Sequence, residues 1–266
     1  MGLGALALVA CSSETGSPAT RFGTVLLESN SGVEPAQRAT GYFYRYASTP
    51  VSGKCFLSEE LGACRVWKCD DYSTEDKIET MPVTAGPISV TGTKPGVVLV
   101  EGDTGSYAPE AALDAPLWVG GERLRVAVAG SDEFPAASLG VIAPEPITLT
   151  APDVSEEPLQ FDASKDLAFA WAAIENSNVF AVVSIAVPKP DGEGNVLFPG
   201  LDCAYFGTTG AGLVPASVLA KLPKPDSIAG YQVEALTFAS NAIRVDDAVL
   251  TLQATSFSLS TLATVE

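Results

Sequence analysis

Three tyrosines occupy alternate positions in the short stretch GYFYRY. The stretch is typical of a β-strand, in which successive side chains point to opposite faces. Tyr42, Tyr44 and Tyr46 would then share one face, with Phe43 and Arg45 on the other. Tyrosine rings combine apolar faces with polar tips, which suits contact with a sugar or a protein. The row is therefore a possible binding face, and the alternative is that it lines a core whose hydroxyls reach the rim.

Oxygen ligands cluster in DGEGN, residues 191–195, which holds two carboxylates and an amide. Such a glycine-rich turn could bind Ca²⁺, but it lacks the D-x-D-x-D spacing and the distal glutamate of a calcium loop. We interpret it as a solvated hairpin turn and predict no metal site. The acidic pairs Asp70-Asp71 and Asp246-Asp247 are likewise interpreted as turn formers at strand ends.

The sequence contains no histidine. This excludes Ser-His-Asp and Cys-His catalysis as well as zinc held by histidine. An enzyme would need a carboxylate pair, a Ser-Lys arrangement or a cofactor. No serine lies in a G-x-S-x-G elbow, and the loop GTTGAG at residues 207–212 lacks the lysine of a P-loop. We therefore predict no catalytic residue, no cofactor and a protein that is not an enzyme.

The chain is acidic, with 32 Asp and Glu residues against 15 Lys and Arg and a formal net charge of −17. Such a field repels phosphate backbones, so nucleic-acid binding is excluded. It also disfavours docking onto anionic lipid. Hydrophobic residues make up 47% of the chain and charged residues 18%, which indicates a folded protein with a substantial core.

Besides Cys11, the sequence has four cysteines: Cys55, Cys64, Cys69 and Cys203. An even number in an exported chain indicates two disulfides, and the spacings do not match a zinc Cys₄ site. On one strand, Cys64 and Cys69 would lie on opposite faces about 16 Å apart, beyond the roughly 7 Å that a disulfide can bridge. We therefore expect Cys55 to pair with Cys64 or Cys69 across a hairpin, and the remaining cysteine to pair with Cys203.

Short runs of Val, Ile, Leu, Phe and Thr, separated by Gly, Pro and Asp, recur along the whole chain. This pattern predicts an all-β fold of sandwich type. In the first half we expect strands at residues 22–27, 41–47, 54–57, 63–68, 88–92, 96–101, 117–119 and 123–129. The pair Gly120-Gly121 would form the tight turn between the last two of these.

The sequence APEP at residues 143–146 stiffens the chain, since each proline fixes its own φ and restrains the preceding residue. We place a domain boundary there, giving two Ig-like β-sandwich domains in tandem, at residues 21–144 and 145–266. In the second we expect strands at 147–151, 167–171, 179–187, 196–198, 201–206, 231–239 and 249–262. Trp171 would pack centrally, and Pro215 would open one short helix with Val218, Leu219 and Leu222 on one side.

The first ten residues are uncharged and apolar, and they end in Leu8-Val9-Ala10-Cys11. This sequence resembles the lipobox of bacterial lipoproteins. The resemblance implies that residues 1–10 are a signal peptide, shortened because the usual Lys or Arg is missing, and that Cys11 is lipidated after cleavage. Residues 11–20 would then form a flexible tether. Ser12, directly after the cysteine, resembles the residue that directs lipoproteins of enteric bacteria to the outer membrane.

Several longer stretches resemble a group of uncharacterised lipoproteins of myxobacteria: GACRVWKC, LWVGGERLRVAVAG, EFPA, APEPITLTAP, LAFAWA and LDCAYFGTTGAGLVPASVL. This resemblance implies an exported, two-part β protein but no activity. The expected function is a non-catalytic binding or structural role in the cell envelope, with a protein or polysaccharide as partner. The alternatives are a glycan hydrolase that uses a carboxylate pair and a subunit of an envelope assembly.

Overall fold

The computed structural model describes residues 20–30, 37–46, 55–69, 80–102, 105–113, 116–153, 159–176, 178–190, 196–225 and 230–265. The predicted signal peptide, Cys11, most of the tether, Asp70-Asp71 and the DGEGN turn lie outside these residues. Lipidation at Cys11 therefore remains a prediction. In the described part of the chain, no helix is both long enough and apolar enough to cross a bilayer.

The described chain is built almost entirely of β-strands, as predicted. In chain order its elements are β1 (Arg21–Asn30), β2 (Gln37–Tyr46), β3 (Cys55–Leu61), β4 (Cys64–Cys69), β5 (Thr80–Pro82), β6 (Ile88–Thr91), β7 (Val97–Glu101), β8 (Ser106–Pro109), β9 (Arg123–Val128), β10 (Ala137–Ile142), β11 (Leu149–Ala151), β12 (Leu159–Phe161), β13 (Leu167–Trp171), β14 (Phe180–Ala186), β15 (Lys189–Pro190), β16 (Val196–Leu197), β17 (Gly200–Phe206), the 3₁₀ turn η2 (Gly207–Thr209), β18 (Ala211–Val214), α1 (Ala216–Leu219), β19 (Tyr231–Val245) and β20 (Ala248–Val265).

One large sheet contains most of these strands, in the order β10-β9-β6-β7-β8-β2-β1-β20-β19-β14-β17-β4-β3. Two further strands are attached to it, β12 to β20 and β5 to β2. A three-stranded sheet, β11-β13-β18, and the small pair β15-β16 complete the described strands.

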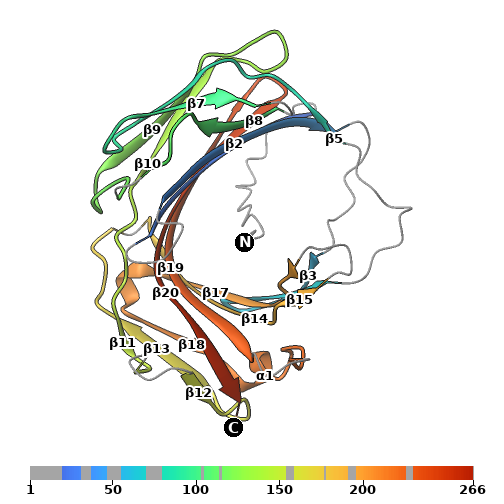
Figure 1. The fold of residues 1–266 in the computed structure, drawn as a ribbon. Helices are drawn as coiled ribbons and strands as arrows, with labels where there is room; N and C mark the ends of the chain where they lie inside the picture. The colour runs from blue at the N-terminus through green and yellow to red at the C-terminus, as the bar shows by residue number, and fades with distance from the viewer. Residues whose placement is uncertain are drawn as a thin grey trace.

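The long hairpin β19-β20 lies at the centre of the large sheet, and Figure 1 shows it running along the curved wall of this C-shaped sheet. Outside one half of this wall lie β7, β9 and β10, and outside the other half lie β11, β13 and β18. The curved wall thus has an outer side covered by two β-layers and an inner, concave side. One of these layers is the β10-β9-β6-β7-β8 end of the same large sheet, which continues from the wall through the pairing of β2 with β8. The turn between β19 and β20 contains Asp246 and Asp247, so this acidic pair is a turn former, as expected.

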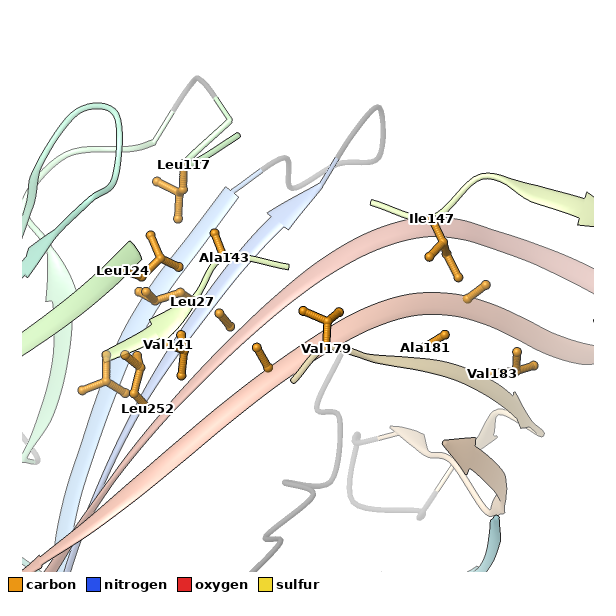
Figure 2. Close-up of a cluster of buried hydrophobic side chains, with 14 of the residues drawn as sticks. Leu27, Leu117, Leu124, Val141, Ala143, Ile147, Val179, Ala181, Val183 and Leu252 are labelled. Atoms are coloured by element: carbon orange, nitrogen blue, oxygen red, sulfur yellow. The ribbon is translucent and has the colours of Figure 1, made fainter. Parts of the chain in front are cut away.

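The core lies between the curved wall and the outer layers. Strand β9 alternates strictly between exposed and buried residues, because one of its faces meets water and the other meets the wall. Leu27 of β1 and Leu252 of β20 are fully buried and meet Leu124 of β9 and Val141 of β10 (Figure 2). Burying each such leucine contributes roughly 1.5–3 kcal/mol, so this contact helps to stabilise the outer layer against the wall.

In the other half, Trp171 of β13 is 4% exposed, so its prediction as a central packing residue is confirmed. Its indole Nε1 donates a hydrogen bond to the carbonyl oxygen of Gly207 at 3.0 Å. The glycine-rich loop at residues 207–212 therefore packs against the three-stranded sheet and helps to hold Trp171 in place. The short helix α1 is also confirmed, with Val218 and Leu219 buried.

The predicted boundary near Pro144 does not divide the hydrogen bonding of the chain. Strand β1, from before the boundary, pairs in parallel with β20 over its whole length. Strand β4 pairs with β17, which also lies beyond the boundary. The two halves seen in Figure 1 are therefore not two consecutive segments, because each contains strands from both sides of Pro144.

Two local predictions also differ from the structure. Residues 117–119 do not form a strand, because their backbone amides donate to side chains and not to a neighbouring strand: Leu117 to Oε1 of Gln37 at 3.2 Å and Val119 to Oε2 of Glu122 at 3.0 Å. Strands β5, β8, β10, β12, β15 and β18 were not predicted. For β8 and β10, the sequences SYAP and ASLGVI contain small residues and few β-branched ones, so the apolar pattern that marks a strand is weak.

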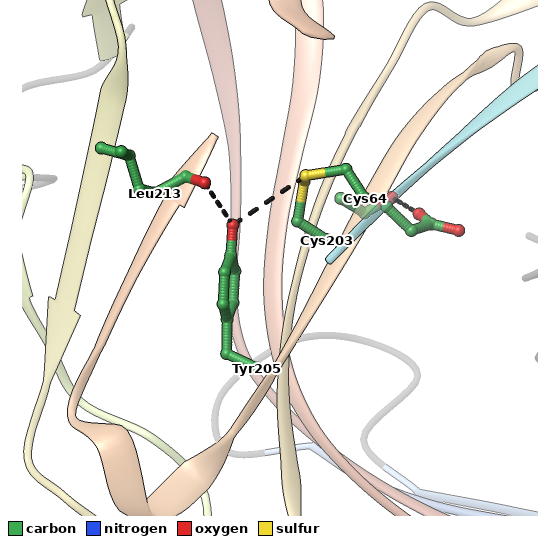
Figure 3. Close-up of a disulfide and its surroundings, with 6 residues drawn as sticks. Cys64, Cys203, Tyr205 and Leu213 are labelled. Carbon is green, nitrogen blue, oxygen red and sulfur yellow. Dashed lines mark hydrogen bonds between the residues drawn. A yellow bond between two sulfur atoms is a disulfide. The ribbon is translucent and has the colours of Figure 1, made fainter. Parts of the chain in front are cut away.

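One disulfide joins the two strands of the hairpin β3-β4, and a second joins this hairpin to the wall. Cys55 pairs with Cys69, and Cys64 pairs with Cys203 of β17, which is one of the two arrangements that the sequence left open. Beside the second bridge, the hydroxyl of Tyr205 donates to the carbonyl oxygen of Leu213 at 2.8 Å (Figure 3). Burial raises the pKa of Tyr205 to about 12, so this hydroxyl remains a donor and ties β17 to β18.

Candidate binding surface on the concave face

The concave face is defined by strand register. On β1, Val25 and Leu27 point outward into the core, so Thr24, Leu26 and Glu28 must point inward. Residues paired directly across neighbouring strands share a face, and the strand register continues this inner face from β2 through β1, β20, β19, β14 and β17 to β4. In Figure 1 no described layer lies over this inner side.

The predicted tyrosine row begins on this face. Tyr42 is 44% exposed, and Tyr44 is half-buried and stacked on Phe22 with ring centroids 5.8 Å apart. Phe43 points the other way and is buried against the rings of Tyr107 and Phe134. The alternation expected from the sequence is thus present at these residues. The side chain of Tyr46 lies outside the described part of the structure.

A row of polar side chains crosses the face where the sheet approaches β4. The register places Glu234 of β19, Ser184 of β14, Asp202 of β17 and Arg65 of β4 side by side. Ser184 Oγ donates to Asp202 Oδ1 at 2.6 Å, and Arg65 Nε lies 3.2 Å from Oε1 of Glu60. We call these five residues the polar row. Since each strand is about 4.8 Å from the next, the Cα atoms of Asp202 and Glu234 lie about 10 Å apart.

Two carboxylates of the polar row, Asp202 and Glu234, are held in a poorly solvated place. Burial raises the pKa of Asp202, while the hydrogen bond from Ser184 and the charge of Arg65 act in the opposite direction. Burial also raises the pKa of Glu234, against a 2.7 Å hydrogen bond from Gln232, and the negative charges of Asp202 and Glu28 raise it further. The surroundings of both carboxylates therefore disfavour their ionised forms.

An apolar strip lies directly beside the polar row. We define it as two adjoining rows across β17, β14, β19 and β20, which are separate from the main core: Phe206, Phe180 and Phe238 in one, and Ala204, Val182, Leu236 and Phe257 in the other. Val182, Leu236 and Phe238 are buried, whereas Phe206 is 55% exposed. The rings of Phe180 and Phe206 have centroids 5.1 Å apart. The strip thus ends in an accessible aromatic pair on β14 and β17.

Sequence reasoning found neither the polar row nor the apolar strip. Their residues come from strands far apart in the chain, and only the register brings them to one face. The alternating pattern of β17, GLDCAYF, does place Asp202 and Ala204 on one face and Cys203 on the other, so a partial signal was present. Within the described residues, no three Cys, Asp or Glu side chains come together as a metal-binding group.

No known protein family matches the sequence, and no curated protein matches it either. Among solved structures, the chain is similar to the FN1–FN3 domains of chicken CNTN1, with 11% identity over 80% of this chain and 64% of that one, and a TM-score of 0.19. A tetra-tandem repeat from the extending region of a large adhesion protein gives 15% identity over 90% of this chain and 50% of that one, and a TM-score of 0.18. The chain spans less than two thirds of either, and these TM-scores are too low to support an argument about fold or function.

Proposed function

We propose that this chain is a bacterial envelope lipoprotein, anchored through a lipid on Cys11, that acts without catalysis by binding a protein or polysaccharide on its concave face. The observation that carries the binding role is the composition of that face. An exposed tyrosine, an accessible aromatic pair and a row of carboxylates all point to one side of a sheet that no described layer covers. A purely structural β-wall would need none of these exposed aromatic rings.

The disulfides support the location outside the cytoplasm. Stable bridges form in oxidising compartments such as the periplasm and the cell surface, and this chain has two. The net charge of −17 supports the need for a lipid anchor, because an acidic protein is repelled by anionic lipid head groups.

Anchoring is tested by expressing the full chain and its Cys11→Ser variant in the native host with radiolabelled palmitate. We expect label and membrane association for the unchanged chain and neither for the variant. Equal partitioning of the two into the soluble fraction would contradict the anchor. Protease treatment of intact and lysed cells then distinguishes a surface location, with digestion in intact cells, from a periplasmic one.

The binding role is tested with the Tyr42→Ala variant. Isolated cell-surface polysaccharide is titrated into the unchanged chain, this variant and the control Val98→Ala, which removes a similarly exposed side chain from β7. We expect weaker binding for Tyr42→Ala alone. Equal affinities would remove the tyrosine from the polysaccharide site.

A second function, glycan hydrolysis, is favoured by one observation: Asp202 and Glu234 share a face, and both have a raised pKa. Inverting and retaining glycosidases place two carboxyl groups about 5–10 Å apart around the scissile bond. Release of reducing ends from the same polysaccharide by the unchanged chain, and its loss in Glu234→Gln, would establish this function. No release would leave binding as the role of the face.

A further inference from the structure

Two neighbouring rows of side chains cross the concave face at its tyrosine end, and both follow from the strand register. The first row, which we call the hydroxyl row, consists of Ser106 of β8, Tyr42 of β2, Thr24 of β1 and Thr251 of β20. The second, which we call the apolar row, consists of Pro82 of β5, Tyr44 of β2, Phe22 of β1 and Val249 of β20. Successive residues on one face of a strand lie about 7 Å apart, so the two rows lie side by side.

Both rows are accessible along their whole length. Each member is at least partly exposed, and Tyr42 and Pro82 are fully in the exposed class. In Figure 1 no described layer lies over β2, β1 and β20 on this side of the sheet. The rings of Tyr44 and Phe22 are within 22° of parallel, with centroids 5.8 Å apart, so each restrains the other. A molecule laid across the strands would therefore contact both rows without displacing a core side chain.

The hydroxyl row offers hydrogen-bonding groups that the described chain does not use. Within the described residues, the side-chain hydroxyls of Tyr42, Thr24 and Thr251 take part in no hydrogen bond. Each hydroxyl can donate one hydrogen bond and accept others, and the pairing of neighbouring strands places these residues about 4.8 Å apart. From β8 to β20 the row crosses three such spacings, or about 14 Å. A polyhydroxylated chain matches this row, because its own hydroxyls also donate and accept.

The charge of the two rows favours a neutral occupant. Neither row contains a charged side chain, although the whole chain carries a formal net charge of −17. A cationic ligand would find no carboxylate in either row with which to pair, and an acidic polysaccharide would be repelled by the field of the chain. An acyl chain would cover the rings but leave the hydroxyls without partners where water is displaced, which is unfavourable.

From this arrangement we infer that the hydroxyl row and the apolar row together bind an uncharged polysaccharide that lies across β8, β2, β1 and β20. Sugar hydroxyls would bond to Tyr42, Thr24 and Thr251, and the apolar face of a sugar ring would pack on Tyr44 and Phe22. The inference deepens the proposed binding role, because it assigns the partner to one class and one part of the face. It rests on that role, but it does not depend on the lipid anchor.

The test uses the full chain with Cys11→Ser, so that no acyl group is attached, and measures binding by isothermal titration calorimetry. The probes are two fractions of the cell-surface polysaccharide of the native host, separated by anion exchange into an uncharged and an acidic fraction. Thr24→Val and Thr251→Val each remove one hydroxyl from the row but keep a β-branched side chain. Thr91→Val is the matched control, because Thr91 is an exposed threonine of β6 in the outer layer.

We expect the uncharged fraction to bind and the acidic fraction not to bind. Because no ion pair contributes, the affinity should stay the same when salt is added. Thr24→Val and Thr251→Val should each weaken binding about fivefold by removing one hydrogen bond, and Thr91→Val should leave it unchanged. Valine is as favourable in a strand as threonine, so all three variants should fold.

Three results would overturn the inference. Binding of the acidic fraction alone, or an affinity that falls as salt is added, would show that charge selects the polysaccharide. Equal affinities of Thr24→Val, Thr251→Val and Thr91→Val would show that the hydroxyl row does not contact it, even if Tyr42→Ala weakens binding. Absence of binding by both fractions would refute the polysaccharide site, but it would leave a protein partner and the separately tested anchor of the proposed function.

Discussion

Removing the bridge between Cys64 and Cys203 is expected to destabilise the protein more than removing the bridge between Cys55 and Cys69. The first joins residues 139 apart and the second residues 14 apart. A cross-link lowers the entropy of the unfolded chain by an amount that grows with the logarithm of the loop it closes. At 25 °C this gives about 5 kcal/mol for the long loop and about 3 kcal/mol for the short one.

The assay is urea unfolding at equilibrium of two double variants, Cys64→Ala/Cys203→Ala and Cys55→Ala/Cys69→Ala. The free energy of unfolding should be about 2 kcal/mol lower for the first, the difference between the two loop terms. The first pair is also the more deeply buried, so any loss of packing acts in the same direction. Equal stabilities, or the reverse order, would refute the reasoning that loop length controls the contribution of each bridge.

Three further predictions concern single side chains. Phe43→Ala should lower the free energy of unfolding by about 3–5 kcal/mol because it empties a core site, whereas Tyr42→Ala, one residue away on the exposed face, should change it by about 0.5 kcal/mol; similar losses in urea unfolding would contradict the assignment of faces. Gly212→Ala would place its Cβ 2.5 Å from an aromatic ring, so thermal unfolding should show a loss of about 1–3 kcal/mol; Gly96→Ala, whose nearest neighbour would be 3.9 Å away, is the control, and an equal effect there would exclude the ring as the cause. Folding raises the pKa of Asp202, so its ionised form destabilises the folded state increasingly as pH rises from the unfolded-state pKa through the folded-state pKa. The free energy of unfolding of Asp202→Asn, measured relative to the unchanged chain, should therefore be higher at pH 7 than at pH 3. A difference between the two proteins that does not vary with pH would contradict the burial of that charge.

Local patterns in the sequence predicted local structure well. The alternation in GYFYRY put Tyr42 and Phe43 on opposite faces without deciding which face is the core, and the strict alternation around Trp171 predicted its burial. Each depends only on residues within one strand, whose side chains must alternate. The cysteine argument worked for the same reason, since distance along a single strand excluded a bridge between Cys64 and Cys69.

Long-range pairing could not be predicted in this way. Nothing in the sequence of β1 specifies that its partner is β20, because strand pairing depends on which edges remain open when the whole sheet forms. Strand pairing crosses the expected boundary at Pro144 for this reason: prolines stiffen the chain locally but do not prevent strands on either side from pairing. The polar row was missed because Glu234, Ser184 and Asp202 become neighbours only through the register of three strands.

The parallel pairing of β1 with β20 also has a consequence for the order of events during synthesis. The first described strand of the chain finds its neighbour only when the last one is available. Contacts of such sequence separation form slowly and late, so β1 must wait with one open edge until β20 has emerged. If the chain is exported as proposed, the curved wall closes only after β20 has been translocated. An exported fragment that lacks β20 would leave β1 without this neighbour, and such an edge is a target for chaperones, proteases and aggregation.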